Sequence, residues 1–118
     1  MTVALTLLAT AAVQVAAGGF SATCSGTSYF STSIKSYCEA SDQESTYSSD
    51  IDLSKCLANV GGKLVVRVTS PSFKFCDCGL AGDKKTLNCR CTDSKGVKQP
   101  TSINLDTCLS NNDSNLVC

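Results

Sequence analysis

Residues 49–59, Ser-Asp-Ile-Asp-Leu-Ser-Lys-Cys-Leu-Ala-Asn, align without a gap on residues 101–111, Thr-Ser-Ile-Asn-Leu-Asp-Thr-Cys-Leu-Ser-Asn. Both copies continue through a turn into a short apolar stretch. A repeat period of about fifty residues indicates two similar structural units that stack to bury a shared core. Since neither unit buries enough apolar surface alone, we expect repeat one (19–68) and repeat two (72–118) to form a single domain.

The sequence around these copies alternates between apolar and polar residues, which is typical of short β-strands. Turn residues interrupt the alternation at regular intervals, for example at Gly61-Gly62 and at Lys95-Gly96. We therefore predict an all-β fold, with single helical turns only where Asp or Ser can cap them. The predicted inward-facing sets are Ile34, Ser36 and Cys38; Leu64, Val66 and Val68; and Leu87, Cys89 and Cys91.

The first 17 residues differ from the rest, because they carry no charged side chain and consist mainly of Ala, Leu and Val. They are too few for a membrane span, and the small residues Val15-Ala16-Ala17 suit signal peptidase. We interpret 1–17 as a signal peptide, in preference to a buried N-terminal helix. The mature domain is then 18–118, and its expected location is secreted and extracellular.

Nine cysteines follow that segment, a density typical of small proteins in an oxidising compartment. The odd number leaves one thiol either free or bound to another molecule, so the protein is expected to be a monomer or a disulfide-linked dimer. The pairs Cys76-Asp77-Cys78 and Cys89-Arg90-Cys91 suggest a zinc site. One intervening residue is poor spacing for a structural zinc knuckle, so disulfides are favoured and no metal is predicted.

Charge and composition exclude several classes of function. The formal net charge is zero and there is no basic run, which argues against nucleic acid or membrane partners. The sequence has no His, so catalytic triads and histidine-based metal hydrolases are excluded. Carboxylate pairs such as Asp50 with Asp52 permit a glycosidase in principle, but they lie in the repeated motif. We predict a protein that is not an enzyme and needs no cofactor.

Several segments together resemble the cyanovirin-N family of lectins, in particular its cysteine-rich secreted fungal members. They are 19–24 (Gly-Phe-Ser-Ala-Thr-Cys), the motif 49–64, Phe73 with Cys76, and 103–116. The resemblance implies a pseudo-two-fold domain in which each repeat forms a triple-stranded sheet and a hairpin. It also implies that the halves exchange strands, that Cys24 pairs with Cys38, and that Cys76 pairs with Cys91. The remaining cysteines have no counterpart in the founding member, and sequence leaves their pairing open, including a nested Cys78–Cys89 bridge.

The implied activity is binding of oligomannose, especially terminal α1-2-linked mannose, on glycans or glycoproteins, mainly through one site. Asn amides and carboxylates suit this task, because they offer paired donors and acceptors to vicinal hydroxyls. Carried over residue by residue, the first sugar site comprises Thr23, Glu39, Ser41, Asn111, Asn112 and Asp113. A weaker second site comprises Asn59, Val60, Gly61, Ser72, Thr92 and Asp93. The plain alternative is that 111–115 is simply a polar turn.

Asn112-Asp113-Ser114 is also a candidate N-glycosylation site, because Ser114 replaces the turn glycine of the family. A glycan on Asn112 is expected to block or fill the first site. The alternative function is a secreted cysteine-rich interaction or effector protein that keeps the fold without binding sugar.

Overall fold

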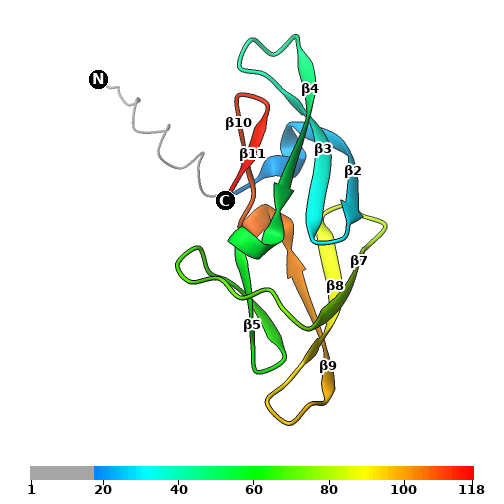
Figure 1. Cartoon of the computed structure of the whole chain (residues 1–118). Coiled ribbons are helices and arrows are strands. Elements are labelled where there is room, and N and C mark those ends of the chain that lie inside the picture. Colours follow the sequence, from blue (N-terminus) through cyan, green and yellow to red (C-terminus); the bar gives the residue numbers. More distant parts are fainter. Residues whose placement is uncertain (1–17) are drawn as a thin grey trace, which may run out of the picture.

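The computed structural model describes residues 18–118. The predicted signal peptide, 1–17, lies outside the described residues. Figure 1 shows an assembly of short strands joined by turns and loops. Within residues 18–118 there are also three short 3-10 turns, η2 (Phe20–Ala22), η3 (Leu53–Lys55) and η4 (Leu105–Thr107). The strands are β2 (Cys24–Phe30), β3 (Ser33–Glu39), β4 (Thr46–Asp52), β5 (Leu57–Val60), β6 (Lys63–Val66), β7 (Cys76–Leu80), β8 (Thr86–Thr92), β9 (Lys98–Asn104), β10 (Ser110–Asn112) and β11 (Asn115–Val117).

The same arrangement occurs twice along the chain. Strands β2-β3-β4 form an antiparallel sheet, followed by η3 and the hairpin β5-β6. Strands β7-β8-β9 form a second antiparallel sheet, followed by η4 and the hairpin β10-β11. The all-β, pseudo-two-fold fold expected from the sequence is therefore confirmed. Within 18–118, no helix is long and apolar enough to cross a membrane.

The repeated motif supplies the turn that links each sheet to its hairpin. Asp52 caps η3 by accepting a hydrogen bond from the backbone N–H of Ser54 at 2.9 Å. Asn104 caps η4 in the same way, accepting from the N–H of Asp106 at 2.9 Å. Asp and Asn are preferred at this position because they satisfy an otherwise unpaired N–H. Single helical turns are present as predicted, but a cap by Asp or Ser is confirmed only for η3, because η4 is capped by Asn and η2 follows Gly19 without a side-chain cap. Asp52 has a structural role.

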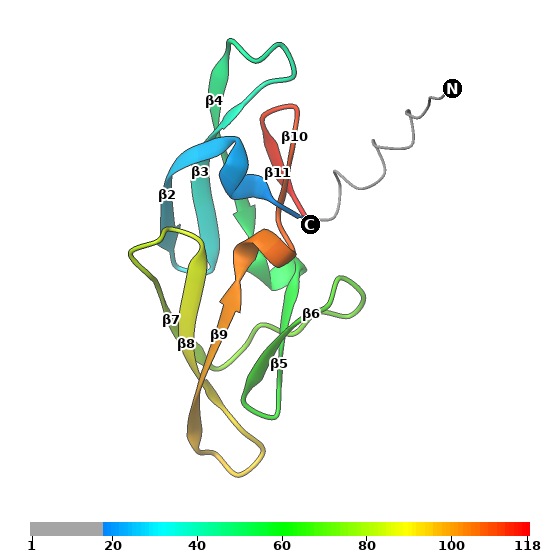
Figure 2. The ribbon, with the colours of Figure 1, turned by 180° about the vertical axis from the view of Figure 1, so that it is seen from behind.

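Each hairpin packs against the sheet of the other repeat. The N–H of Leu116 in β11 donates to Ser49 Oγ in β4 at 3.0 Å. The N–H of Leu64 in β6 donates to Thr101 Oγ1 in β9 at 3.1 Å. Figures 1 and 2 show β10-β11 beside β4 and β5-β6 beside β9. The exchange implied by the family resemblance is thus present, and it brings the end of repeat two next to the start of repeat one.

Apolar side chains from both repeats form one core. Two of the three predicted inward sets are confirmed, since alternate residues of β3 and β8 are buried. The third set is wrong beyond Leu64: Val66 is 46 % exposed and Val68 is 59 % exposed. The reason is that β6 ends at Val66 and pairs only with β5, so Val66 is the last residue of the strand and Val68 lies beyond it, where the alternation no longer applies. The largest fully buried apolar residues are Phe20, Ile34, Leu53, Leu57, Leu87, Leu105 and Leu109.

Eight cysteines form four disulfides, and the two implied pairings are present. The four bridges are Cys24–Cys38, Cys76–Cys91, the nested Cys78–Cys89, and Cys56–Cys118. The cysteines of the doublets that suggested zinc are therefore paired with one another as disulfides. Cys108 keeps a free thiol that is 6 % exposed, and burial raises its pKa to about 11. A buried, protonated thiol is a poor nucleophile, which disfavours a disulfide-linked dimer through Cys108.

Candidate functional site

Two pockets related by the repeat lie beside the β10-β11 and β5-β6 turns. Figures 1 and 2 show these two hairpins in opposite halves of the molecule. The first pocket, a cavity of about 410 Å³, lies between the start of repeat one and the β10-β11 turn. All six residues predicted for the first sugar site line it, together with Gly18, Gly19, Ala40 and Gln43. The fold therefore brings together residues from the two ends of the described chain, as the exchanged hairpins require.

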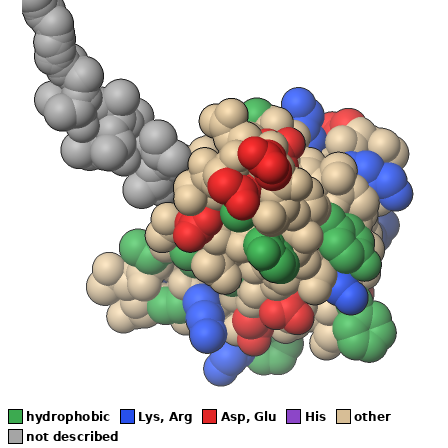
Figure 3. Space-filling view, turned by 90° about the horizontal axis from the view of Figure 1, so that it is seen from above, with side chains coloured by type: hydrophobic (Ala, Val, Ile, Leu, Met, Phe, Trp, Pro, Cys, Tyr) green, Lys and Arg blue, Asp and Glu red, His purple; other side chains and the backbone are tan. Residues whose placement is uncertain are grey.

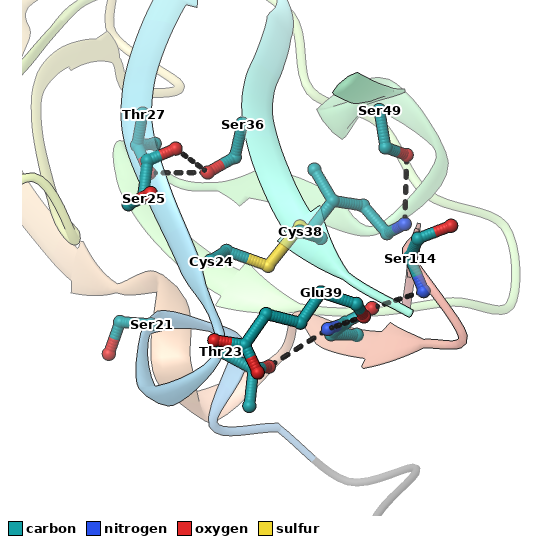
Figure 4. Close-up of a disulfide and its surroundings, with 12 residues drawn as sticks. Ser21, Thr23, Cys24, Ser25, Thr27, Ser36, Cys38, Glu39, Ser49 and Ser114 are labelled. Atoms are coloured by element: carbon teal, nitrogen blue, oxygen red, sulfur yellow. Dashed lines mark hydrogen bonds between the residues drawn. A yellow bond between two sulfur atoms is a disulfide. The ribbon is translucent and has the colours of Figure 1, made fainter. Parts of the chain in front are cut away.

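Asn111 holds the first pocket together. Its Nδ2 donates to Thr23 Oγ1 and to the carbonyl oxygen of Glu39, both at 2.9 Å. Its Oδ1 accepts from the N–H of Ser114 at 2.8 Å, which closes the hairpin turn. Figure 4 shows Thr23 and Glu39 beside the Cys24–Cys38 disulfide, which fixes the two strand ends that carry them. Because both N–H groups of the Asn111 amide are already used, its main contribution is to position Thr23 and Glu39.

Other groups of the first pocket remain available to a ligand. Thr23 Oγ1 accepts from Asn111, so its own hydroxyl proton is free to be donated. The Glu39 and Asn112 side chains form no hydrogen bond with the rest of residues 18–118. Asp113 Oδ1 accepts from the N–H of Ser41 at 2.8 Å, which joins the β3-β4 loop to the β10-β11 turn. The pocket thus presents the Glu39 carboxylate, the Asn112 amide and the Thr23 hydroxyl, and hydrogen bonds between the surrounding loops hold its backbone in place.

The first pocket lies at an acidic end of the molecule. Figure 3, which looks down on this end, shows Asp and Glu side chains gathered close together. Lys and Arg are absent from the segments around the pocket, 18–34, 39–54 and 110–118. The acidic residues of the pocket and of the adjoining loop are Glu39, Asp42, Glu44 and Asp113.

The second pocket, about 240 Å³, repeats this construction at the other end. Asn59 takes the place of Asn111: its Nδ2 donates to the carbonyl oxygens of Lys74 and Thr92, both at 3.0 Å. Its Oδ1 accepts from the N–H of Gly62 at 2.8 Å. Five of the six residues predicted for the second site line the pocket, and Val60 is the exception. The five are Asn59, Gly61, Ser72, Thr92 and Asp93.

Asp93 of the second pocket is occupied by its own loop. Its Oδ1 accepts from the N–H groups of Lys95 at 2.8 Å and Val97 at 2.9 Å. Its Oδ2 accepts from Gln99 Nε2 at 3.0 Å. The hydrogen bond from the Val97 N–H, followed by those from Gln99 and Lys95, lowers the pKa of this carboxyl. Asp93 therefore shapes the β8-β9 turn and offers fewer free acceptor positions than Glu39.

Three lining residues of the second pocket were not among the residues predicted for the second site: Lys74, Phe75 and Ser94. Phe75 is 73 % exposed and directly precedes Cys76, just as Thr23 directly precedes Cys24. That shared position relative to the bridge cysteine could have identified Phe75 from sequence. Lys74 is the basic side chain that lines the second pocket, because the lining residues at the end of β8, Thr92, Asp93 and Ser94, include no Lys or Arg.

Among known families, a sequence model of the CVNH domain matches residues 20–117. No curated protein matches the chain significantly.

Solved structures with a similar architecture include two CVNH proteins and microvirin. A MoCVNH3 variant (Mo0v) in complex with (N-GlcNAc)4 is 18 % identical, with a TM-score of 0.75 over 86 % of this chain and 97 % of that one. GzCVNH of Gibberella zeae is 16 % identical, with a TM-score of 0.67 over 83 % and 94 %. The microvirin:mannobiose complex is 29 % identical, with a TM-score of 0.65 over 85 % and 97 %.

Proposed function

The chain belongs to the CVNH family, and from this premise we propose that it is a carbohydrate-binding protein that performs no chemical turnover. CVNH domains are lectins, and two of the similar solved structures are complexes with sugars, (N-GlcNAc)4 and mannobiose. The observation that carries the proposal for this chain is the first pocket. There Asn111 bridges the two repeats and holds Thr23 and Glu39 in place with two hydrogen bonds of 2.9 Å.

The proposed ligand of the first pocket is oligomannose with terminal α1-2-linked mannose. The Glu39 carboxylate can accept from two vicinal hydroxyls, while Thr23 and Asn112 can donate to sugar oxygens. Hydrogen bonds to a charged group contribute about 1.5–3 kcal/mol each. An open polar pocket without aromatic stacking suits single-site affinities of roughly micromolar to millimolar. Glu39 is therefore expected to dominate binding.

The proposal excludes catalysis on two grounds. The sequence contains no His. The two carboxylates of the first pocket differ in their surroundings, because Asp113 is engaged by the Ser41 N–H while Glu39 is free of protein partners within 18–118. Two-carboxylate glycosidases need a pair flanking the scissile bond, and the role of Asp113 in joining two loops does not fit that requirement.

The test is titration of the protein with α1-2-linked dimannose, followed by backbone amide shifts. We expect shifts at Thr23, Glu39 and Ser41, and Glu39→Gln should weaken binding about tenfold by removing a charged acceptor. Glu44→Gln is the matched control, because Glu44 lies in the same acidic loop without lining the pocket. If millimolar dimannose shifts none of these amides in folded protein, the lectin proposal fails and the interaction-protein alternative replaces it.

A second ligand class, oligomers of N-acetylglucosamine, is supported for the second pocket by one observation. The exposed ring of Phe75 lies beside Ser72, Thr92 and Ser94, so an apolar surface adjoins three hydroxyl groups. Aromatic faces pack against apolar ligand surfaces, and hydroxyls can satisfy an acetamido group. Phe75→Ser should abolish shifts caused by chitotetraose at this end. Phe30→Ser is the control, since Phe30 is 81 % exposed and lines neither pocket.

The proposal includes secretion, which the four disulfides support because such bridges persist in oxidising compartments. Expression of the full chain in a eukaryotic host tests it: the protein should appear in the medium and begin at Gly18. Retention inside the cell with residues 1–17 still attached would contradict it.

A further inference from the structure

The two hairpin turns have the same backbone but different residues. In the β5-β6 turn, Gly61 and Gly62 have φ angles of 60° and 90°. In the β10-β11 turn, Asp113 and Ser114 have φ angles of 50° and 71°. Left-handed backbone costs non-glycine residues about 1–2 kcal/mol each. The second turn therefore carries strain that glycine would relieve, and Ser114 is the residue that completes the acceptor sequence Asn112-Asp113-Ser114.

Asn112 is placed to be modified. It is exposed, and its side-chain amide forms no hydrogen bond with the rest of residues 18–118. Its neighbour Asn111 differs in this respect, because the Asn111 amide is bound to Thr23, Glu39 and Ser114. Modification of Asn112 thus breaks no hydrogen bond of the fold. Since Asn112 also lines the first pocket, a group attached to it starts inside the proposed binding site.

We propose that Asn112 is N-glycosylated and that the attached glycan occupies the first pocket, so that the modification controls access to this site. The inference rests on the proposed function for the identity of the competing ligand. The donor is a lipid-linked diphosphate oligosaccharide of the secretory pathway. Nδ2 of Asn112 attacks C1 of the first sugar, the bond from C1 to the diphosphate oxygen breaks, and the lipid diphosphate leaves. The amide nitrogen releases one proton to solvent as the C–N bond forms, and the lipid diphosphate keeps the electron pair of the broken C1–O bond.

An attached glycan competes with free sugar at high effective concentration. Tethering through a short linker gives effective concentrations of about a millimolar. That value is comparable to the roughly micromolar to millimolar dissociation constants expected for a pocket of this kind. The mannose-rich glycans of the secretory pathway belong to the ligand class proposed for the pocket. The second pocket is unaffected, because Val60-Gly61-Gly62 contains no acceptor sequence.

The test uses the full chain secreted from a glycosylating host, and the wild-type protein from a disulfide-forming bacterial strain. Ser114→Gly is made in both hosts, since it removes the acceptor sequence while leaving every lining residue of the pocket intact. Intact mass reports the glycan. We expect the secreted wild-type protein to carry one glycan at Asn112. It should bind α1-2-linked dimannose at least about twofold more weakly than secreted Ser114→Gly, and more so the smaller the dissociation constant is relative to the millimolar effective concentration. In the bacterial preparations the two should bind equally.

A second measurement tests, without any added sugar, whether the attached glycan occupies the first pocket. Amide shifts of Thr23, Glu39 and Ser41 should differ between the glycosylated and bacterial wild-type proteins, because the glycan lies against them. An unmodified mass for the secreted protein, or identical shifts at these three amides in a glycosylated protein, overturns the inference. Failure of the bacterial protein to bind dimannose instead overturns the proposed function, and the amide shifts still report whether the glycan fills the pocket.

Discussion

At the scale of single residues, the shape of both pockets depends on asparagine side chains whose polar atoms are used within the protein. Asn111 and Asn59 occupy equivalent positions in the two repeats, and each uses both N–H groups and its carbonyl oxygen within the protein. The net contribution of one hydrogen bond to the stability of a folded protein is about 0.5–1.5 kcal/mol. The two asparagines therefore stabilise the hairpin ends and shape the pockets at the same time.

Asn111→Ala should lower the free energy of unfolding by about 1–3 kcal/mol, because three hydrogen bonds are lost and two partners are left exposed to water. It should also abolish dimannose binding at the first pocket, since Thr23 and Glu39 lose their common anchor. Urea denaturation and amide-shift titration measure the two effects. Asn59→Ala is the matched control, with a similar loss of stability and unchanged first-pocket binding. Undiminished binding by Asn111→Ala would contradict the positioning role.

At the scale of elements, the β5-β6 and β10-β11 hairpins have turns with the same left-handed backbone but different residues. The β5-β6 turn has glycine at both left-handed positions, whereas the β10-β11 turn has Asp113 and Ser114. A Cβ added at Gly62 would lie 3.0 Å from Gln99 Cγ and 3.1 Å from Asp93 Cβ. Glycine at position 62 is therefore required by packing as well as by φ, while serine at position 114 is tolerated.

Exchanging residues between the turns should change stability in opposite directions. Ser114→Gly should raise the unfolding free energy by about 1 kcal/mol, since it removes the left-handed strain and keeps the N–H that binds Asn111. Gly62→Ser should lower it by about 1–3 kcal/mol, because strain and steric contact add. Thermal unfolding of unglycosylated protein measures both. Equal effects of the same sign would show that the turn backbone differs from that described.

At the scale of the whole molecule, the repeats are linked by a disulfide that the family resemblance did not imply. Cys56 follows η3 in repeat one, and Cys118 follows β11 in repeat two, with a sequence separation of 62 residues. The bridge therefore fastens the last hairpin to the middle of the chain. Loop-closure entropy grows with loop length, so this crosslink restricts the unfolded chain more than the short hairpin bridges do.

The double variant Cys56→Ser/Cys118→Ser should lose about 4 kcal/mol of unfolding free energy by the chain-entropy estimate. Cys78→Ser/Cys89→Ser should lose much less, because its 11-residue loop lies inside the loop already closed by Cys76–Cys91. Guanidinium denaturation under non-reducing conditions compares the two. A larger loss for the nested bridge would mean that local packing, and not loop closure, decides the contribution of these disulfides.

The neutral net charge conceals a separation of charge between the two ends. Acidic residues predominate in the half around the first pocket, formed by 18–55 and 105–118, and basic residues predominate in 56–104, which carries the second pocket. Exposed charges act over about 10 Å at 0.1 M salt, so the two pockets experience opposite local potentials. The basic residues of the second half are Lys63, Arg67, Lys74, Lys84, Lys85, Arg90, Lys95 and Lys98.

Anionic sugars should therefore discriminate between the pockets. Mannose 6-phosphate is expected to shift amides at Thr92 and Ser94 of the second pocket and to leave those of Glu39 and Ser41 unchanged. The shifts should disappear in 1 M NaCl, where the Debye length falls to about 3 Å, and in Lys74→Glu. Neutral dimannose provides the control, because its binding should be insensitive to salt. Equal shifts at both ends would show that the separated charges do not select the ligand.

The sequence by itself determined the features that depend on neighbouring residues. The repeat, the capped turns after β4 and β9, and the inward faces of β3 and β8 all follow from local spacing, since strand alternation and capping act over a few positions. The tertiary structure alone decided the rest. Asn111 donates a hydrogen bond to Thr23, 88 positions away in the sequence, and Asn59 donates one to Thr92, 33 positions away. Neither local segment could therefore predict that the amide groups of these asparagines are already used within the protein. Exposure of Val66, the membership of Lys74 and Phe75 in a pocket, and the separation of charge likewise depend on which segments the exchanged hairpins bring together. Their physical cause is burial and hydrogen bonding between distant parts of the chain, which local sequence does not specify.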